Sequence, residues 1–142
     1  MSEEFVDLSN VDINDTFEMT VLPAGTEAEL RIVSLLKAQD KNGNDYLMPF
    51  FEILEDNTAK EFGDYMLLPN KVSMNPKEFN KAALRLQGFA KAFDIDFSQP
   101  LDIKNDIVGK TGWAILGLKK DQEGEDINSI KKYIPTGGNA PF

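Results

Sequence analysis

Three segments in the first half of the chain are predicted to be β-strands, and in the first of them apolar residues recur at every second position, as in a strand that buries one face. These segments are residues 27–37, 45–54 and 60–68. An Asn-Gly pair at residues 42–43 separates the first two segments and is the strongest short-range signal for a β-hairpin. The three strands are therefore expected to form a meander. The side chains of the first strand that are expected to face the core are Ala28, Leu30 and Ile32.

The apolar spacing changes to that of a helix after Asn75. Asn75 is a favourable N-cap, Pro76 suits the first helical position, and apolar residues follow at intervals of three and four. This pattern predicts one helix of about 16 to 18 residues. Two further strands are expected over residues 113–120 and 127–134. Three strands, a helix and two strands predict a mainly β fold, a five-stranded OB-fold-like Greek-key barrel with the helix between strands 3 and 4.

The alternation along these strands separates a core face from an outer wall. The residues expected to line the core are Leu47, Phe51 and Ile53 of the second strand, Leu116 and Leu118 of the fourth, and Ile130 and Ile134 of the fifth. The opposite face mixes rings with cations, and single-stranded nucleic acid binds such surfaces because bases stack on rings while Lys and Arg contact phosphates. The candidate nucleic-acid-binding residues are Arg31, Lys37, Lys41, Tyr46, Met48, Phe50, Trp113, Lys119, Lys131 and Tyr133, and Lys132 is a further candidate for phosphate contact. The alternative is that the rings form a second small core beneath the helix or the N-terminal arm.

The composition excludes many catalytic sites. The 142 residues contain no Cys and no His, so disulfides, thiol nucleophiles and Ser-His-Asp triads are absent. The sequence Gly109-Lys110-Thr111 lacks the earlier Gly of a phosphate-binding loop, and the acidic turn around Gly124 lacks the spacing of a calcium loop. We therefore assign no catalytic residue, metal ligand or cofactor and expect no enzymatic activity. An enzyme that uses Asp or Glu with a divalent metal ion remains the weakest of three alternatives.

Negative charge is concentrated at the N-terminus. The formal net charge is -9, yet residues 1–29 hold eight of the 24 acidic residues and none of the 15 basic ones. The rest of the chain is nearly neutral, so an acidic total does not exclude a local basic surface. The expected organisation is an acidic N-terminal arm (residues 1–22), an OB-fold domain (23–136) and a flexible C-terminal tail (137–142).

The chain has no segment that resembles a membrane span or a targeting peptide. Its longest apolar run, residues 46–51, is far shorter than the roughly 20 residues that cross a bilayer. The first 30 residues contain no Lys or Arg, unlike a signal or transit peptide. A cytoplasmic protein that does not bind membranes is the expectation.

Several stretches carry a resemblance to a known family. They are Gly25-Thr26-Glu27-Ala28, the hairpin Lys41-Asn42-Gly43-Asn44-Asp45-Tyr46-Leu47 continuing to Phe51-Glu52-Ile53, Gly109-Lys110-Thr111, and residues 128–135. In their order and intervals, residues 25–135 resemble small phage-encoded single-stranded DNA-binding proteins. The resemblance implies an OB-fold, binding of single strands without sequence preference during phage DNA replication or recombination in the host cytoplasm, and no enzymatic activity.

The two ends of the chain bear differently on this resemblance. Pro141-Phe142 resembles the terminal Phe, often after Pro, with which bacterial and phage single-strand binders dock replication and recombination proteins. Residues 133–142 contain no Asp or Glu, however, whereas those tails are acidic. The acids lie at the other end, and our hypothesis is that residues 1–29 compete with nucleic acid for the basic face. The leading alternative function is an acidic protein-protein interaction module that does not bind nucleic acid.

Overall fold

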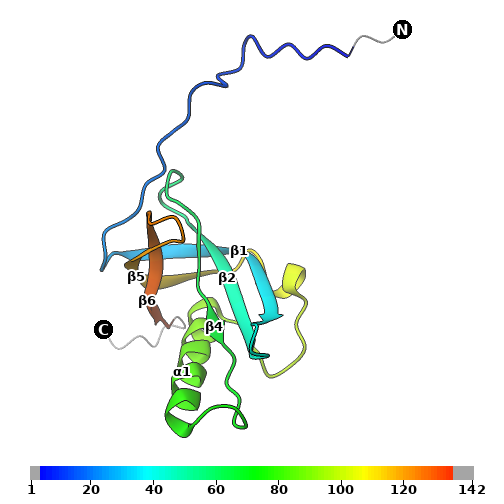
Figure 1. The fold of residues 1–142 in the computed structure, drawn as a ribbon, viewed down its shortest axis with the longest axis vertical. Helices are drawn as coiled ribbons and strands as arrows, with labels where there is room; N and C mark the ends of the chain where they lie inside the picture. Colours follow the sequence, from blue (N-terminus) through cyan, green and yellow to red (C-terminus); the bar gives the residue numbers. More distant parts are fainter. Residues whose placement is uncertain (1–3, 136–142) are drawn as a thin grey trace.

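The computed structural model describes residues 4–135. These residues form a six-stranded antiparallel sheet with one α-helix packed against it (Figure 1). The strands are β1 (Glu27–Gln39), β2 (Asp45–Ile53), β3 (Phe62–Gly63), β4 (Met66–Leu67), β5 (Thr111–Lys120) and β6 (Asp126–Ile134). The helix α1 (Pro76–Phe93) lies between β4 and β5 in the chain, and a π-helical turn, η1 (Ile103–Ile107), follows it. The expected mainly β class is confirmed.

The strands follow the spatial order β3-β2-β1-β5-β6, and β4 also pairs with β2. The expected hairpin joins β1 to β2, where Gly43 has a φ of 81° and its amide donates to the Asp40 carbonyl oxygen at 3.0 Å. A second hairpin joins β5 to β6 around Gly124. The strand pairs assigned within residues 4–135 leave β3 and β6 at the two ends of the sheet. Closure of the sheet into a barrel therefore stays a prediction.

The predicted third strand is interrupted. Instead of one strand over residues 60–68, the chain forms β3 and β4, which pair with β2 in one continuous register. The break lies opposite Pro49 of β2, which has no backbone N–H to donate to a neighbouring strand. The expectation of an uninterrupted strand was wrong for this reason.

The helix α1 begins and ends as its sequence predicts. The Asn75 side chain accepts a hydrogen bond from the Glu78 amide at 2.8 Å, and the Glu78 side chain accepts one from the Asn75 amide at 3.1 Å. This capping box satisfies two amides that the helix itself cannot pair. The 18-residue helix buries Phe89, Ala92 and Phe93 against the sheet. No helix within residues 4–135 is long and apolar enough to cross a membrane.

A buried carboxylate joins the two ends of the sheet to the helix. Asp64, between β3 and β4, is 7% exposed. Its carboxylate accepts hydrogen bonds from the Tyr133 hydroxyl of β6 at 2.5 Å and from Arg85 Nη2 of α1 at 2.6 Å. Arg85 Nη2 also donates to the Ile130 carbonyl oxygen of β6 at 3.2 Å. Side chains therefore connect β6 to the segment between β3 and β4.

Aromatic rings enclose this cluster. The Tyr133 ring lies between the rings of Phe51, Phe89 and Phe93, with centroid distances of 5.5 to 6.4 Å. Burial, reinforced by the negative charge of Asp64, raises the pKa of the Tyr133 hydroxyl well above its ordinary value. Tyr133 is therefore a neutral donor to a buried carboxylate at neutral pH.

Two expected core positions on β5 and β6 are not buried. Leu118 is 46% exposed and pairs with Asn128 close to the β5–β6 turn. Ile134 is only half-buried because a β-bulge in β6, between Ile130 and Lys132, shifts the later residues to the opposite face. The other expected core residues are buried. They are Ala28, Leu30, Ile32, Leu47, Phe51, Ile53, Leu116 and Ile130.

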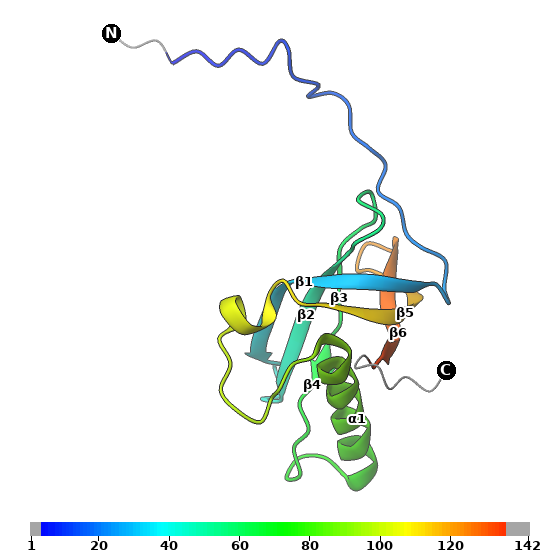
Figure 2. The same cartoon turned by 180° about the vertical axis from the view of Figure 1, so that it is seen from behind.

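The N-terminal segment leaves the body at the end opposite α1, as Figure 2 also shows. All side chains of residues 4–19 are exposed. The body begins at Thr20, whose amide donates to the Thr58 carbonyl oxygen at 2.8 Å, and at Leu22, whose amide donates to the buried Asn128 side chain at 3.0 Å. Residues 4–19 are called the acidic arm below. The expected tail with Pro141 and Phe142 lies outside the described residues.

Two glycines give a matched test of how closely α1 packs on the sheet. A Cβ at Gly112 of β5 would lie 2.5 Å from the Ala92 carbonyl oxygen, a backbone atom that cannot move aside, whereas one at Gly88 would make ordinary contact at 3.7 Å. We expect Gly112→Ala to lower the free energy of unfolding by about 3 kcal/mol through overpacking. Gly88→Ala should raise it by about 0.5 to 1 kcal/mol, since Ala favours a helix interior. Urea unfolding measures both, and equal effects would contradict this packing.

The Asp64 cluster is tested with two tyrosines. We expect Tyr133→Phe to lower the free energy of unfolding by about 2 kcal/mol, because it removes a hydrogen bond to a buried charged group. The control is Tyr65→Phe, since Tyr65 is 44% exposed and its hydroxyl lies 3.4 Å from Asp40. The control should change stability by no more than about 0.5 kcal/mol. A Tyr133 variant as stable as the control would show that the cluster does not hold the sheet together.

Candidate nucleic-acid interface

Aromatic and apolar side chains form a row on the outer face of β2. Tyr46, Met48 and Phe50 are half-buried and alternate with side chains that are buried in the core. Met48 pairs with Leu36 of β1, which is 44% exposed, and the Tyr46 ring lies 4.6 Å from the ring of Tyr65. We call these five residues the β2 platform. The expected outward orientation of the three β2 residues is confirmed.

A glycine gives the platform its close packing. Gly63 of β3 lies directly opposite Phe50. A Cβ at Gly63 would approach Met48 Cε to 2.8 Å and Phe50 Cε1 to 3.0 Å. These two side chains therefore lie over the glycine and cover the space that a larger residue would fill.

Cationic residues lie at both ends of the platform. Lys41 is exposed in the turn that leads into β2. This turn is ordered by Asp40, whose carboxylate accepts hydrogen bonds from the amides of Asn42 and Asn44, both at 2.9 Å. The hydrogen bond from the Asn44 amide is the main reason that the pKa of Asp40 is lowered. At the other end, Arg31 of β1 forms an exposed ion pair with its cross-strand neighbour Glu52.

Trp113 faces outward from β5 and is 38% exposed, as expected. It pairs with Glu29 of β1 on one side and with Ile134 of β6 on the other. β1 separates it from β2 and bends between these two regions (Figure 1). Trp113 thus lies on the same side of the sheet as Arg31 but outside the β2 platform.

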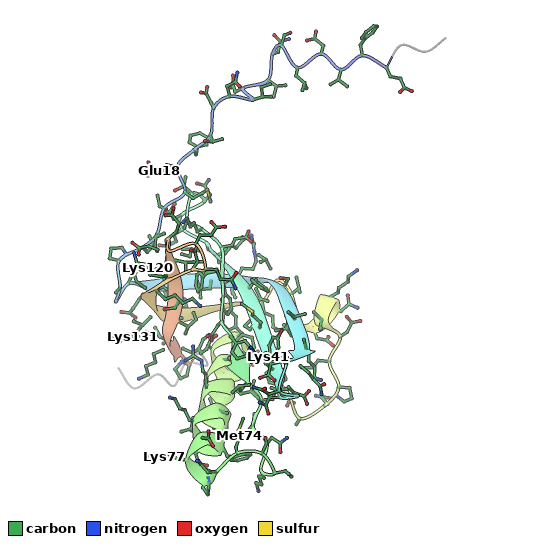
Figure 3. The ribbon with its side chains drawn as sticks, in the orientation of Figure 1. Glu18, Lys41, Met74, Lys77, Lys120 and Lys131 are labelled. Carbon is green, nitrogen blue, oxygen red and sulfur yellow. The ribbon has the colours of Figure 1, made fainter. Side chains whose placement is uncertain are left out.

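The remaining lysines lie away from the platform. Lys119 is exposed near the β5–β6 turn, and Lys131 is exposed at the bulge in β6 (Figure 3). Lys132 follows Lys131 and is also exposed. The expectation that the candidate residues share one wall is therefore only partly met: Tyr46, Met48, Phe50 and the nearby Lys41 and Arg31 lie together, and the others do not.

Two candidate residues do not lie on the predicted outer face of the sheet, in each case because a β-bulge precedes them or changes the register of their strand. Tyr133 was expected to face outward but is 6% exposed, because the bulge at Lys131 reverses the alternation that follows it. Lys37 pairs with Leu47, whose side chain is in the core, so it lies on the opposite side of the sheet from Tyr46. A register shift between Ile32 and Ser34 causes this change in β1.

A groove between α1 and β6 was not foreseen from the sequence. It has a volume of about 730 Å³ and is lined mainly by apolar and basic side chains, with Glu27 as its one acidic residue. The lining includes Leu84 and Arg85 of α1, Ile115 of β5, and Lys131, Lys132 and Ile134 of β6. We call it the α1–β6 groove. The basic residues Arg85 and Lys91 of α1 were a sequence signal for one side of the groove, whereas the other side depends on the bulge in β6.

Neither a metal site nor a family assignment narrows the function. Residues 4–135 contain no group of three or more acidic side chains that could hold a metal ion. A scan against protein-family models found no match, and a search of curated proteins found no significant match. The geometry of the described residues is therefore the basis for the functional proposal.

Proposed function

We propose that the protein binds single-stranded DNA without sequence preference, in DNA replication or recombination, through the outer face of β2. In this proposal the sheet is an OB-fold-like barrel whose ends meet at the Asp64 cluster. Bases stack on Tyr46, Phe50 and Tyr65, and Lys41 and Arg31 contact phosphates. The observation that carries the proposal is the row of outward-facing rings on β2 between these two cations.

The energetics of this surface suit a single strand. Stacking of one base on an aromatic side chain is worth about 1 to 3 kcal/mol and tolerates any base, because every base has a π-face. The ion pair of Arg31 with Glu52 is exposed, and such pairs contribute only about 0.2 to 1 kcal/mol. A phosphate can therefore replace Glu52 as the partner of Arg31 at small cost.

A specific feature of the platform favours the second candidate, a protein partner. Leu36 and Met48 contribute apolar surface that base stacking does not require. Aromatic residues and Met are enriched in protein interfaces, while Lys and Glu are depleted there. In this alternative the platform binds an apolar segment of another protein and has no affinity for DNA.

Fluorescence anisotropy with labelled oligothymidine separates the two candidates. We expect Phe50→Ala to weaken binding by about 5-fold to 150-fold, the loss of one stacked base. Phe97→Ala is the matched control, because this ring is 36% exposed in the loop after α1, and its removal should leave the affinity unchanged. Lys41→Ala should reduce the dependence of affinity on salt by about one phosphate contact.

Three results would contradict DNA binding at this surface. The first is an absence of binding to any single strand at low salt, which would favour a protein partner. The second is a Phe50 variant that binds as tightly as the Phe97 control. The third is an affinity that does not fall with added salt, since phosphate contacts release counterions.

A further inference from the structure

The acidic arm has the composition of a docking segment. Among residues 4–19 there are five acidic side chains and no basic one. Its exposed apolar residues include Val11, Ile13, Phe17 and Met19, of which Phe17 is 86% exposed. In residues 11–19 these four lie at odd positions, Asp12 and Glu18 lie at even positions, and Asp15 is the one acidic residue at an odd position. An extended segment with this pattern presents one mainly apolar face, interrupted by Asp15, and one polar face that carries Asp12 and Glu18.

The α1–β6 groove has a largely complementary composition, with four basic residues and one acidic residue, Glu27, in its lining. Leu84, Ile115 and Ile134 supply apolar surface, and Leu84 is 66% exposed. Lys131 and Lys132 supply positive charge and form no ion pair with another residue of the range 4–135. Arg85 is already bound to Asp64, so these two lysines are available for an external acidic partner. The volume of about 730 Å³ lies within the roughly 300–1,000 Å³ of typical ligand sites.

We propose that the acidic arm of one copy docks through residues 11–19 in the α1–β6 groove of a second copy. The apolar face of the arm covers Leu84, Ile115 and Ile134, and its carboxylates pair with Lys131 and Lys132. Removal of both exposed apolar surfaces from water and the opposite charges favour this contact.

The path of the chain favours a second copy over the groove of the same copy. Hydrogen bonds of Thr20 to the loop before β3, and of Leu22 to Asn128, fix the chain where it leaves the body. From there the arm leads away from α1, and Figure 3 places Glu18 and Lys131 in different parts of the molecule. The arm must reverse its direction to reach its own groove. Extended, 16 residues span about 55 Å, enough to reach a neighbouring molecule.

This contact joins different surfaces on the two copies, so it does not close on itself by two-fold symmetry. Each copy offers one arm and one groove, and such head-to-tail contacts produce chains or rings. We therefore expect a reversible increase of average mass with protein concentration at low salt, in the absence of DNA. The inference does not depend on DNA binding, and its test contains no DNA.

The experiment is a charge swap in the full chain, followed by sedimentation analysis. The groove variant is Lys131→Glu with Lys132→Glu, and the arm variant is Asp12→Lys, Asp15→Lys and Glu18→Lys. In about 50 mM NaCl, where screening is weak, each variant alone should self-associate at least about tenfold more weakly than the unaltered protein. The unaltered protein should become monomeric in about 500 mM NaCl, where screening is strong.

Mixing the two variants tests whether the contact is between molecules. In the mixture each arm meets a groove of opposite charge on the other variant, so association should return. The matched control is Lys77→Glu with Lys104→Glu, which reverses two exposed lysines outside the groove and should associate like the unaltered protein. Circular dichroism of every variant checks that the fold is retained.

Four outcomes would overturn the proposal. One is an unaltered protein that stays monomeric at all concentrations in low salt. Another is a mixture of the two variants in which association does not return. The third is a control variant that loses association as strongly as the groove variant, which would show that only overall charge matters. Crosslinks between arm and groove within a monomer would identify docking in the same copy instead.

Discussion

The buried carboxylate of Asp64 is the constraint on which the rest of the structure depends. A charged group removed from water is costly unless it is paired and hydrogen-bonded. Asp64 meets this requirement with the Tyr133 hydroxyl and the Arg85 guanidinium, from two elements far apart in the chain. Both partners also contact other parts of the fold. The Tyr133 ring packs among the core rings, and Arg85 donates a hydrogen bond to the Ile130 carbonyl oxygen of β6. The cluster thereby fixes α1, β6 and the segment between β3 and β4 relative to one another.

The two faces of β2 separate the aromatic side chains of the core from those that remain outside. Tyr133 is committed to the core, and Phe51 shares that core from the inner face of β2. The outer face of the same strand carries Tyr46 and Phe50, because the alternation within β2 is unbroken. The core and the proposed binding surface are therefore the two faces of one strand, and neither can be shifted by a residue without exchanging the two.

Local signals predicted the elements, whereas irregularities in the strands determined where several side chains point. The Asn-Gly pair predicted the first hairpin, and Asn75 with Pro76 predicted the start of α1, because each signal acts through nearby backbone atoms. The two β-bulges have no comparable signal, since an extra residue in a strand is accommodated through its pairing with a neighbour. Lys37 and Tyr133 follow these bulges, and their expected orientations were wrong. The break opposite Pro49 could have been anticipated, because proline donates no hydrogen bond to a ladder.

The two proposals use separate surfaces. The β2 platform would bind the strand, and the α1–β6 groove would bind the acidic arm of a neighbouring copy, so both contacts can form at once. Together they describe a protein whose copies line up along a strand while the acidic arms are held away from the bases. In this arrangement the outer face of β2, and not the ring of Tyr133, receives the nucleobases.

Nuclear magnetic resonance of the labelled protein, titrated with oligothymidine, tests that claim most directly. We expect the ring signals of Tyr46, Phe50 and Tyr65 to shift with added strand while those of Tyr133 stay in place. Ring signals of β2 that do not move while others shift, or a Tyr133 ring that shifts as strongly as Phe50, would contradict it.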